Sequence, residues 1–147
     1  MPRIISDEIR RFLAEQANHC CEYCHAPSFL ALAVVTSFEI EHIIPKSKDG
    51  IDEKTNLAFS CPRCNRLKSN RTEAVDPQTK SVVGLFHPRQ QCWSEHFAHS
   101  TDGTQIIGLT PEGRATAQLL RFNDPRVIKT RRAWVTLGLY PPLNLLD

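Results

Sequence analysis

The first part of the chain shows a helical pattern of apolar residues. Over residues 6–17, Ile9, Phe12 and Leu13 recur at helical spacing, and Ser6 stands where an N-cap would lie. Acidic residues follow directly and suit the first turn of a helix, because its unpaired N–H groups favour negative charge. The pattern therefore predicts an amphipathic helix over residues 6–17.

The next pattern is strand-like. Residues 38–44 alternate Phe38 and Ile40 with Glu39 and Glu41, which is typical of a strand with one apolar face. A proline and then a Lys-Asp-Gly turn follow it. The segment is therefore expected to be a short strand that ends before the proline.

A short helix is predicted from the stretch SCPRCNRLKSNR at residues 60–71. Ser60 is expected as its N-cap. Pro62 is tolerated in the first turn, because the N–H that proline lacks would have no partner there.

Strands and then helices are predicted in the second half of the chain. The strands are expected at residues 81–86, around 96–99 and at 104–109, with an Asp102-Gly103 turn joining the last two. Two helices are expected at 111–122 and 125–137, each begun by an N-cap residue and a proline, with Gly138 ending the second. The predicted fold class is α+β, with a first domain at residues 1–80 and a C-terminal extension at 81–147.

Composition changes this picture little. The 147 residues carry a formal net charge of +2, and 41% are hydrophobic, which is ordinary for a globular protein. No apolar run approaches the length of a membrane span, and the N-terminus lacks the apolar core of a signal peptide. A cytoplasmic protein without membrane contact is therefore expected, and there six cysteines favour metal binding over disulfides.

Four of the cysteines form two CxxC knuckles, Cys21-Glu-Tyr-Cys24 and Cys61-Pro-Arg-Cys64. Four thiolates in two such pairs suit a tetrahedral structural zinc site. A redox CxxC and buried free thiols are the alternatives, and Cys20 is an alternative ligand to Cys21. Cys92 is expected to be a small buried residue.

Three further motif blocks follow in a set order. They are EHIIP at residues 41–45, Asn56-Leu57, and CPRCN at 61–65 with Lys68 after it. Together with the knuckles they resemble the HNH endonuclease motif in its zinc-knuckle version. That family folds the motif as two antiparallel strands and a helix around one catalytic divalent ion, the ββα-metal arrangement. Parts of the extension, such as WSEHF, also resemble extensions on some bacterial HNH proteins.

The resemblance implies a role for each matching residue. His42 would be the general base that takes a proton from the attacking water, and Asn56 would tie the loop between the strands and so aim the histidine. Glu41 and Asn65 would be ligands of the catalytic ion, Mg²⁺ or another divalent ion such as Mn²⁺. The family more often has Asp where this chain has Glu41.

The chemistry of these residue types agrees with those roles. A histidine of ordinary pKa, about 6.5, can act as a base near neutral pH, and carboxylate and amide oxygens suit a hard cation. Adjacent residues of an ideal strand point to opposite faces, so Glu41 and His42 are expected at a strand end or a bulge. On the helix, Asn65 is turned by about 100° from Cys64, so zinc would hold the helix that presents Asn65.

Basic residues crowd around this motif and are expected to contact phosphates of a nucleic acid. They are Arg63, Arg66, Lys68, Arg71, Lys46 and Lys48. A second group lies on the last predicted helix, where a DNA contact and an ordinary exposed face are equally open: Arg126, Lys129, Arg131 and Arg132.

The predicted function is a divalent-metal-dependent endonuclease that hydrolyses DNA phosphodiester bonds and needs no small-molecule cofactor. RNA remains open as a substrate. The alternative is a zinc-stabilised DNA-binding or partner-binding module with an inactive nuclease motif. A redox or zinc-storage protein would leave His42, Asn56 and Asn65 without a role.

Overall fold

The computed structural model describes residues 5–31 and 38–142. The chain divides into two compact units, Met1–Arg71 and Thr72–Asp147. The sequence placed the boundary after residue 80. A strand that it did not predict, β3 (Glu73–Val75), pairs with β4 (Val82–Gly84) and joins the intervening residues to the second unit. None of the helices in the described ranges has the length and apolar character needed to cross a membrane.

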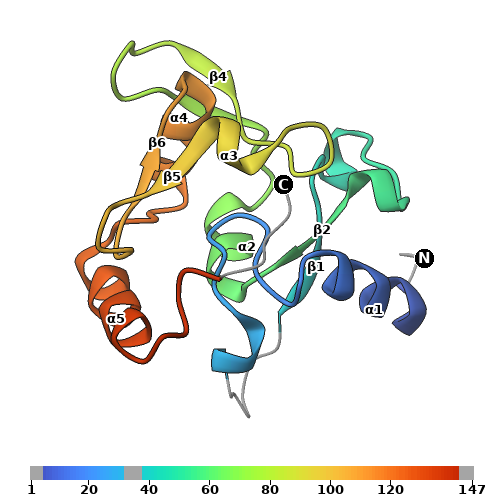
Figure 1. The fold of residues 1–147 in the computed structure, drawn as a ribbon. Helices are drawn as coiled ribbons and strands as arrows, with labels where there is room; N and C mark the ends of the chain where they lie inside the picture. Colours follow the sequence, from blue (N-terminus) through green and yellow to red (C-terminus); the bar gives the residue numbers. More distant parts are fainter. Residues whose placement is uncertain (1–4, 32–37, 143–147) are drawn as a thin grey trace. The chain divides into compact units, whose positions relative to one another are not determined.

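The first unit is built on one hairpin. Strand β1 (Glu39–His42) pairs antiparallel with β2 (Leu57–Ser60) in an unbroken register from Glu39↔Ser60 to His42↔Leu57. Helix α1 (Asp7–Gln16) precedes the hairpin and helix α2 (Pro62–Lys68) follows it (Figure 1). Single 3-10 turns stand at Ser28–Ala31, Lys46–Lys48 and Lys54–Asn56. The order strand, strand, helix and the mixed α and β content confirm the predicted fold class of this part.

Local sequence explains how the helices begin. Ser6 caps α1, its hydroxyl accepting from the backbone N–H of Ile9 at 3.2 Å, as the sequence predicted. The N-cap of α2 was predicted wrongly. Ser60 is the last residue of β2, and the cap is Cys61, whose Sγ accepts from the N–H of Cys64 at 3.3 Å. Pro62 stands in the first turn of α2, as expected.

The core of the first unit lies between α1 and one face of the hairpin. It consists of Leu13 of α1, of Ala17 directly after that helix, and of Leu57 and Phe59 of β2, with Ile40 of β1 packed against them. Burial of such side chains stabilises the fold by about 1.5–3 kcal/mol each. The alternation of residues along a strand places Glu39 and Glu41 on the opposite face, toward α2.

Over residues 72–142 the second unit contains two further hairpins and three helices. After β3 and β4, α3 (Trp93–His96) leads into β5 (Phe97–His99), which pairs with β6 (Ile106–Gly108). Helices α4 (Pro111–Leu119) and α5 (Pro125–Thr136) follow, capped by Thr110 and Asp124 as predicted.

Its core is aromatic: Phe97 packs on Phe86, Trp93 and Phe122, with ring centroids 5.1–5.6 Å apart. Trp93 is thus a core residue of the second unit.

Candidate functional site

The four knuckle cysteines come together in the first unit. The sulfur atoms of Cys21, Cys24, Cys61 and Cys64 all lie within 4.8 Å of one another, and all four residues are buried. The Sγ atoms of Cys24 and Cys61 are 3.8 Å apart. Tetrahedral Zn–S bonds of about 2.3 Å place sulfurs about 3.8 Å apart, so the cluster fits zinc.

The thiols influence each other's ionisation. Hydrogen bonds from Cys21 and Cys61 lower the pKa of Cys24 well below its usual value. Hydrogen bonds with Cys21, the largest cause, and with Cys24 raise the pKa of Cys61 and Cys64, since a thiolate formed there would lie beside another thiolate. A divalent cation removes this repulsion, because it stabilises all four thiolates at once.

The other two cysteines lie outside the cluster. The Cys20 thiol donates to the carbonyl of Asn18 at 3.4 Å, and burial raises its pKa to about 11. Among the described residues, Cys21 and not Cys20 belongs to the metal-ligand group. Cys92 is exposed, which corrects the expectation that it would be a small buried residue.

The hairpin separates Glu41 and His42 onto opposite faces. The register is regular through Glu41↔Ala58 and His42↔Leu57, and β1 ends at His42. Of the two expected arrangements, a strand end or a bulge, the structure has the strand end. Glu41 therefore points to the polar face that α2 covers, while His42 stands at the end of the face that carries Ile40.

The Glu41 carboxylate is buried and fully engaged. Glu41 is 4% exposed and accepts a hydrogen bond from the Tyr23 hydroxyl. Its Oε2 lies 3.3 Å from Nζ of Lys68. Burial raises the pKa of Glu41, although the Lys68 ammonium and the Tyr23 hydrogen bond act against this rise. Burial, followed by the charge of Glu41, raises the pKa of Tyr23 well above its usual value.

Lys68 lies elsewhere than the sequence suggested. It is 1% exposed, and its ammonium donates to the carbonyl of Ile43 at 2.7 Å and of His42 at 3.4 Å. These contacts tie the C-terminal end of α2 to the end of β1. Lys68 therefore has no surface charge to offer a phosphate in this arrangement.

Asn65 lies one helical turn before Lys68 and contacts Glu39, not Glu41. Its Nδ2 donates to Oε2 of Glu39. Because Glu39 and Glu41 share one strand face, α2 makes two neighbouring polar contacts along β1. The carboxylates of Glu39 and Glu41 therefore lie on one face, where Asn65 contacts Glu39 and the Lys68 ammonium already pairs with Glu41. This donor chemistry fits a hard divalent ion.

His42 is held by an acidic residue from the loop between the strands. Its Nε2 lies 2.6 Å from Oδ1 of Asp52, and the other oxygen of Asp52 accepts from Nζ of Lys46 at 2.9 Å. The hydrogen bonds with His42 and Lys46 lower the pKa of Asp52. The His42 side chain is 23% exposed, so solvent reaches the ring.

Asn56 ties the same loop. It is buried, its Oδ1 accepts from the N–H of Ile44 at 2.8 Å, and its Nδ2 donates to the carbonyls of Ile44 and Ile51 at 2.9 Å each. Gly50 makes this loop tight, since a Cβ there would lie 1.7 Å from the Ile44 carbonyl oxygen. These bonds fix the residues that directly follow His42.

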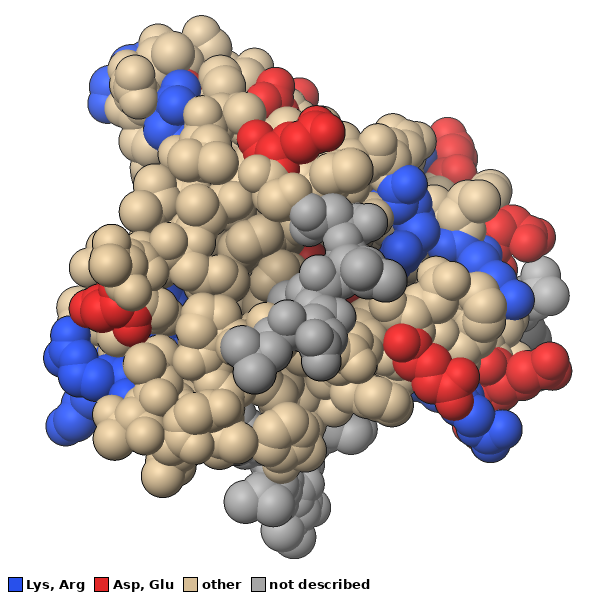
Figure 2. Space-filling model, in the orientation of Figure 1, with Lys and Arg blue, Asp and Glu red and all other residues tan. Residues whose placement is uncertain are grey.

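The remaining basic residues of the first group lie at the surface to different degrees. Arg66, Arg71 and Lys48 are exposed, Arg63 is half-buried, and Lys46 pairs with Asp52. On the face drawn in Figure 2, Lys and Arg form several small groups with Asp and Glu between them, and one group lies over α5. Among the basic residues of α5, Arg131 is 2% exposed and donates to the Thr104 carbonyl at 3.0 Å, so it belongs to the core.

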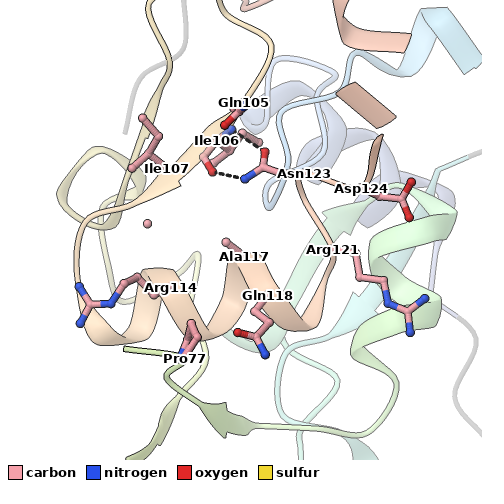
Figure 3. A pocket seen from close by; sticks show the side chains of 11 residues that line it. Pro77, Gln105, Ile106, Ile107, Arg114, Ala117, Gln118, Arg121, Asn123 and Asp124 are labelled. Atoms are coloured by element: carbon pink, nitrogen blue, oxygen red, sulfur yellow. Dashed lines mark hydrogen bonds between the residues drawn. The ribbon is translucent and has the colours of Figure 1, made fainter. Parts of the chain in front are cut away.

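The second unit has a pocket of about 590 Å³ between β6 and α4. Its lining includes Ile106, Ala117 and Gln118, and the Asn123 amide makes two hydrogen bonds to the main chain of Ile106 (Figure 3). None of the residues that the sequence marked for chemistry lines this pocket. The candidate site is the end of β1, where His42 contacts Asp52 and Asn56 holds the loop that follows.

Three residues of the site have no signal in the sequence. Tyr23 and Glu39 lie within segments noted for other reasons, and Asp52 is one of several acidic residues in a polar loop. No spacing rule relates a loop residue to a strand end, because the path of the loop decides which side chain returns to His42.

Comparison with protein families agrees with this geometry. Residues 21–71 match the HNH endonuclease family, and the four cysteines fit its zinc-knuckle version. Over these residues the chain is therefore similar to an HNH endonuclease domain, a class of domain associated with nuclease activity, nucleic-acid binding and metal binding.

A relative was also found. The chain is 29% identical over 123 residues to the Septu protein PtuB of Bacillus mycoides (strain KBAB4), an alignment that covers 66% of this chain and 40% of that protein. The chain thus matches less than half of the relative's length. No solved structure matched significantly.

Proposed function

We propose that this chain is an endonuclease that hydrolyses DNA phosphodiester bonds with a divalent ion, with His42 as the general base. The observation that carries the proposal is how His42 is held at the end of β1. Its ring is held from one side by Asp52 and is open to solvent, and the family match covers it. A base that activates water needs both a fixed orientation and access to that water.

The reaction follows from this arrangement. A water molecule beside the ring gives its proton to His42 while its oxygen forms a bond to phosphorus. The bond from phosphorus to the leaving oxygen breaks, and that oxygen takes a proton from solvent. Asn56 keeps the loop after His42 in place, so that the ring meets the phosphate in one orientation.

Glu41 and Asn65 would hold the catalytic ion, with Glu39 beside them. When bound, Mg²⁺ or Mn²⁺ would supply positive charge to the scissile phosphate and the leaving oxygen. Zinc at the four cysteines would have a structural task, because two of its ligands lie at the start of α2, the helix that carries Asn65. Arg63, Arg66, Arg71 and Lys48 would contact the DNA backbone.

A second candidate function is a zinc-stabilised DNA-binding or partner-binding module without nuclease activity. The contacts of Glu41 favour it, since Tyr23 and Lys68 occupy the carboxylate that would bind the ion.

A plasmid assay with zinc-loaded protein separates the two. Nicking or linearisation on addition of Mg²⁺ or Mn²⁺, and none before, supports the nuclease. DNA retention without cleavage under every ion supports the binding module. Divalent ions should be added to metal-depleted buffer, because a chelator would also remove the structural zinc.

A further inference from the structure

We propose that Asp52 is the positioning residue of the His42 base: it accepts a hydrogen bond from Nε2–H of His42 and thereby leaves the Nδ1 lone pair to take the proton. The inference rests on the proposed function and adds a residue to it. It comes from the 2.6 Å contact between Nε2 of His42 and Oδ1 of Asp52.

The protonation pattern follows from the partners of Asp52. A carboxylate only accepts hydrogen bonds, so a neutral His42 must place its single proton on Nε2 to satisfy the contact. Within the described residues, nothing is hydrogen-bonded to Nδ1 of His42. The basic lone pair therefore faces away from Asp52, and the ring is 23% exposed to admit water.

Lys46 fixes the orientation of Asp52 in turn. Its ammonium, a donor only, lies 2.9 Å from Oδ2, so each carboxylate oxygen has one partner. As His42 takes the proton, the carboxylate also lies against the imidazolium that forms and stabilises it. The loop geometry supports this arrangement, because Asn56 bonds to the carbonyl of Ile51, the residue before Asp52.

The same partners make one variant diagnostic. In Asp52→Asn the amide has one accepting oxygen and one donating nitrogen. Lys46 can only donate, so the amide oxygen turns to Lys46 and the NH₂ group turns to His42. Nε2 of His42 must then accept a hydrogen bond from this NH₂ group, so the ring proton moves to Nδ1. The Nδ1 lone pair that would take the proton from water is then lost. Replacing Lys46 with Met in the Asp52→Asn protein frees the amide to turn back and restores the first pattern.

The matched control is Asp49→Asn. Asp49 lies in the same loop, at φ 66°, a conformation that Asn adopts readily, and no described side chain is hydrogen-bonded to its carboxylate. The Asp49→Asn substitution removes one negative charge, as Asp52→Asn does, next to the proposed DNA contacts, and it leaves the contacts of His42 unchanged.

The test combines nitrogen NMR of the His42 ring with steady-state cleavage kinetics. We expect the ring proton on Nε2 in the wild type and on Nδ1 in Asp52→Asn, with both spectra recorded at the same pH. We expect kcat to fall about 10²-fold with KM unchanged, as for a displaced reactive group. Asp49→Asn should change neither the ring proton nor kcat.

Two results would overturn the proposal: a wild-type ring with its proton on Nδ1, or an Asp52→Asn protein that keeps both the wild-type ring proton and kcat. If the wild type cleaves no DNA with any ion, the proposed function fails. The NMR arm still decides whether Asp52 sets the protonation of His42.

Discussion

Breaking the buried contact between Lys68 and Glu41 should destabilise the first unit strongly. In Lys68→Met the Glu41 carboxylate stays 4% exposed but loses its cation, and the carbonyls of Ile43 and His42 lose a donor. Removing one partner of a buried ion pair costs about 3–5 kcal/mol. For a unit of this size about 3 kcal/mol corresponds to a fall in Tm of about 12–24 °C.

A double-mutant cycle isolates the pair from the other effects of the substitution. Glu41→Gln keeps the shape of the side chain and removes its charge, so the double variant Glu41→Gln/Lys68→Met leaves no charge buried. We expect the double variant to be more stable than the sum of the single effects predicts, with a coupling energy of about 1–3 kcal/mol.

The assay is a urea titration of zinc-loaded protein, followed by the amide NMR signals of β2. These signals report the first unit alone, because β2 lies in that unit. Tryptophan fluorescence would report the second unit instead, since both tryptophans lie there. Lys48→Met is the matched control: Lys48 is exposed, and its loss should change the free energy of unfolding by less than about 0.5 kcal/mol. A cost below about 1 kcal/mol for Lys68→Met, or additive effects in the cycle, would refute the reasoning.

Two further predictions concern zinc and pH. Cys64→Ser should lose bound zinc and lower the Tm of the first unit, whereas Cys92→Ser, at an exposed position, should keep both; an unchanged melting curve for Cys64→Ser would count against a structural zinc. Burial, with Arg131 nearby, lowers the pKa of His99 to about 4 in the folded chain. As the pH falls, His99 therefore takes up a proton in the unfolded chain before it does so in the folded chain. The free energy of unfolding of the second unit should decline from about pH 6.5 to pH 4. Tryptophan fluorescence in urea should show this slope, and His99→Gln should flatten it; an equal slope in both proteins would contradict the assignment.

Much of the local structure could be predicted because it depends on neighbouring residues. Ser6, Thr110 and Asp124 cap helices in the structure as their positions in the sequence suggested. The two CxxC pairs predicted which four thiols come together, since each knuckle brings two thiols close to each other before the chain folds further. The alternation of β1 predicted a strand end or a bulge at Glu41 and His42. The strand does end at His42, but its regular register leaves the two side chains on opposite faces.

The contacts that define the site depend on the fold and could not be predicted. Lys68 was grouped with surface charges because its sequence neighbours are basic, but α2 turns its side chain under β1 to Glu41. Asp52 reaches His42 only because the loop doubles back between its two 3-10 turns. Ser60 was predicted as the N-cap of α2, but β2 continues through Ser60 and the Sγ of Cys61 caps the helix.

The cleavage rate of His42→Ala, measured under conditions in which the wild type nicks plasmid DNA, decides whether His42 is the general base. Loss of a general base should lower kcat by about 10²–10⁴-fold. Zinc content and the β2 amide signals should stay at wild-type values, since His42 lies at the end of its strand and outside the cysteine cluster. Added imidazole should restore part of the rate. A His42→Ala protein that cleaves at the wild-type rate would contradict the account.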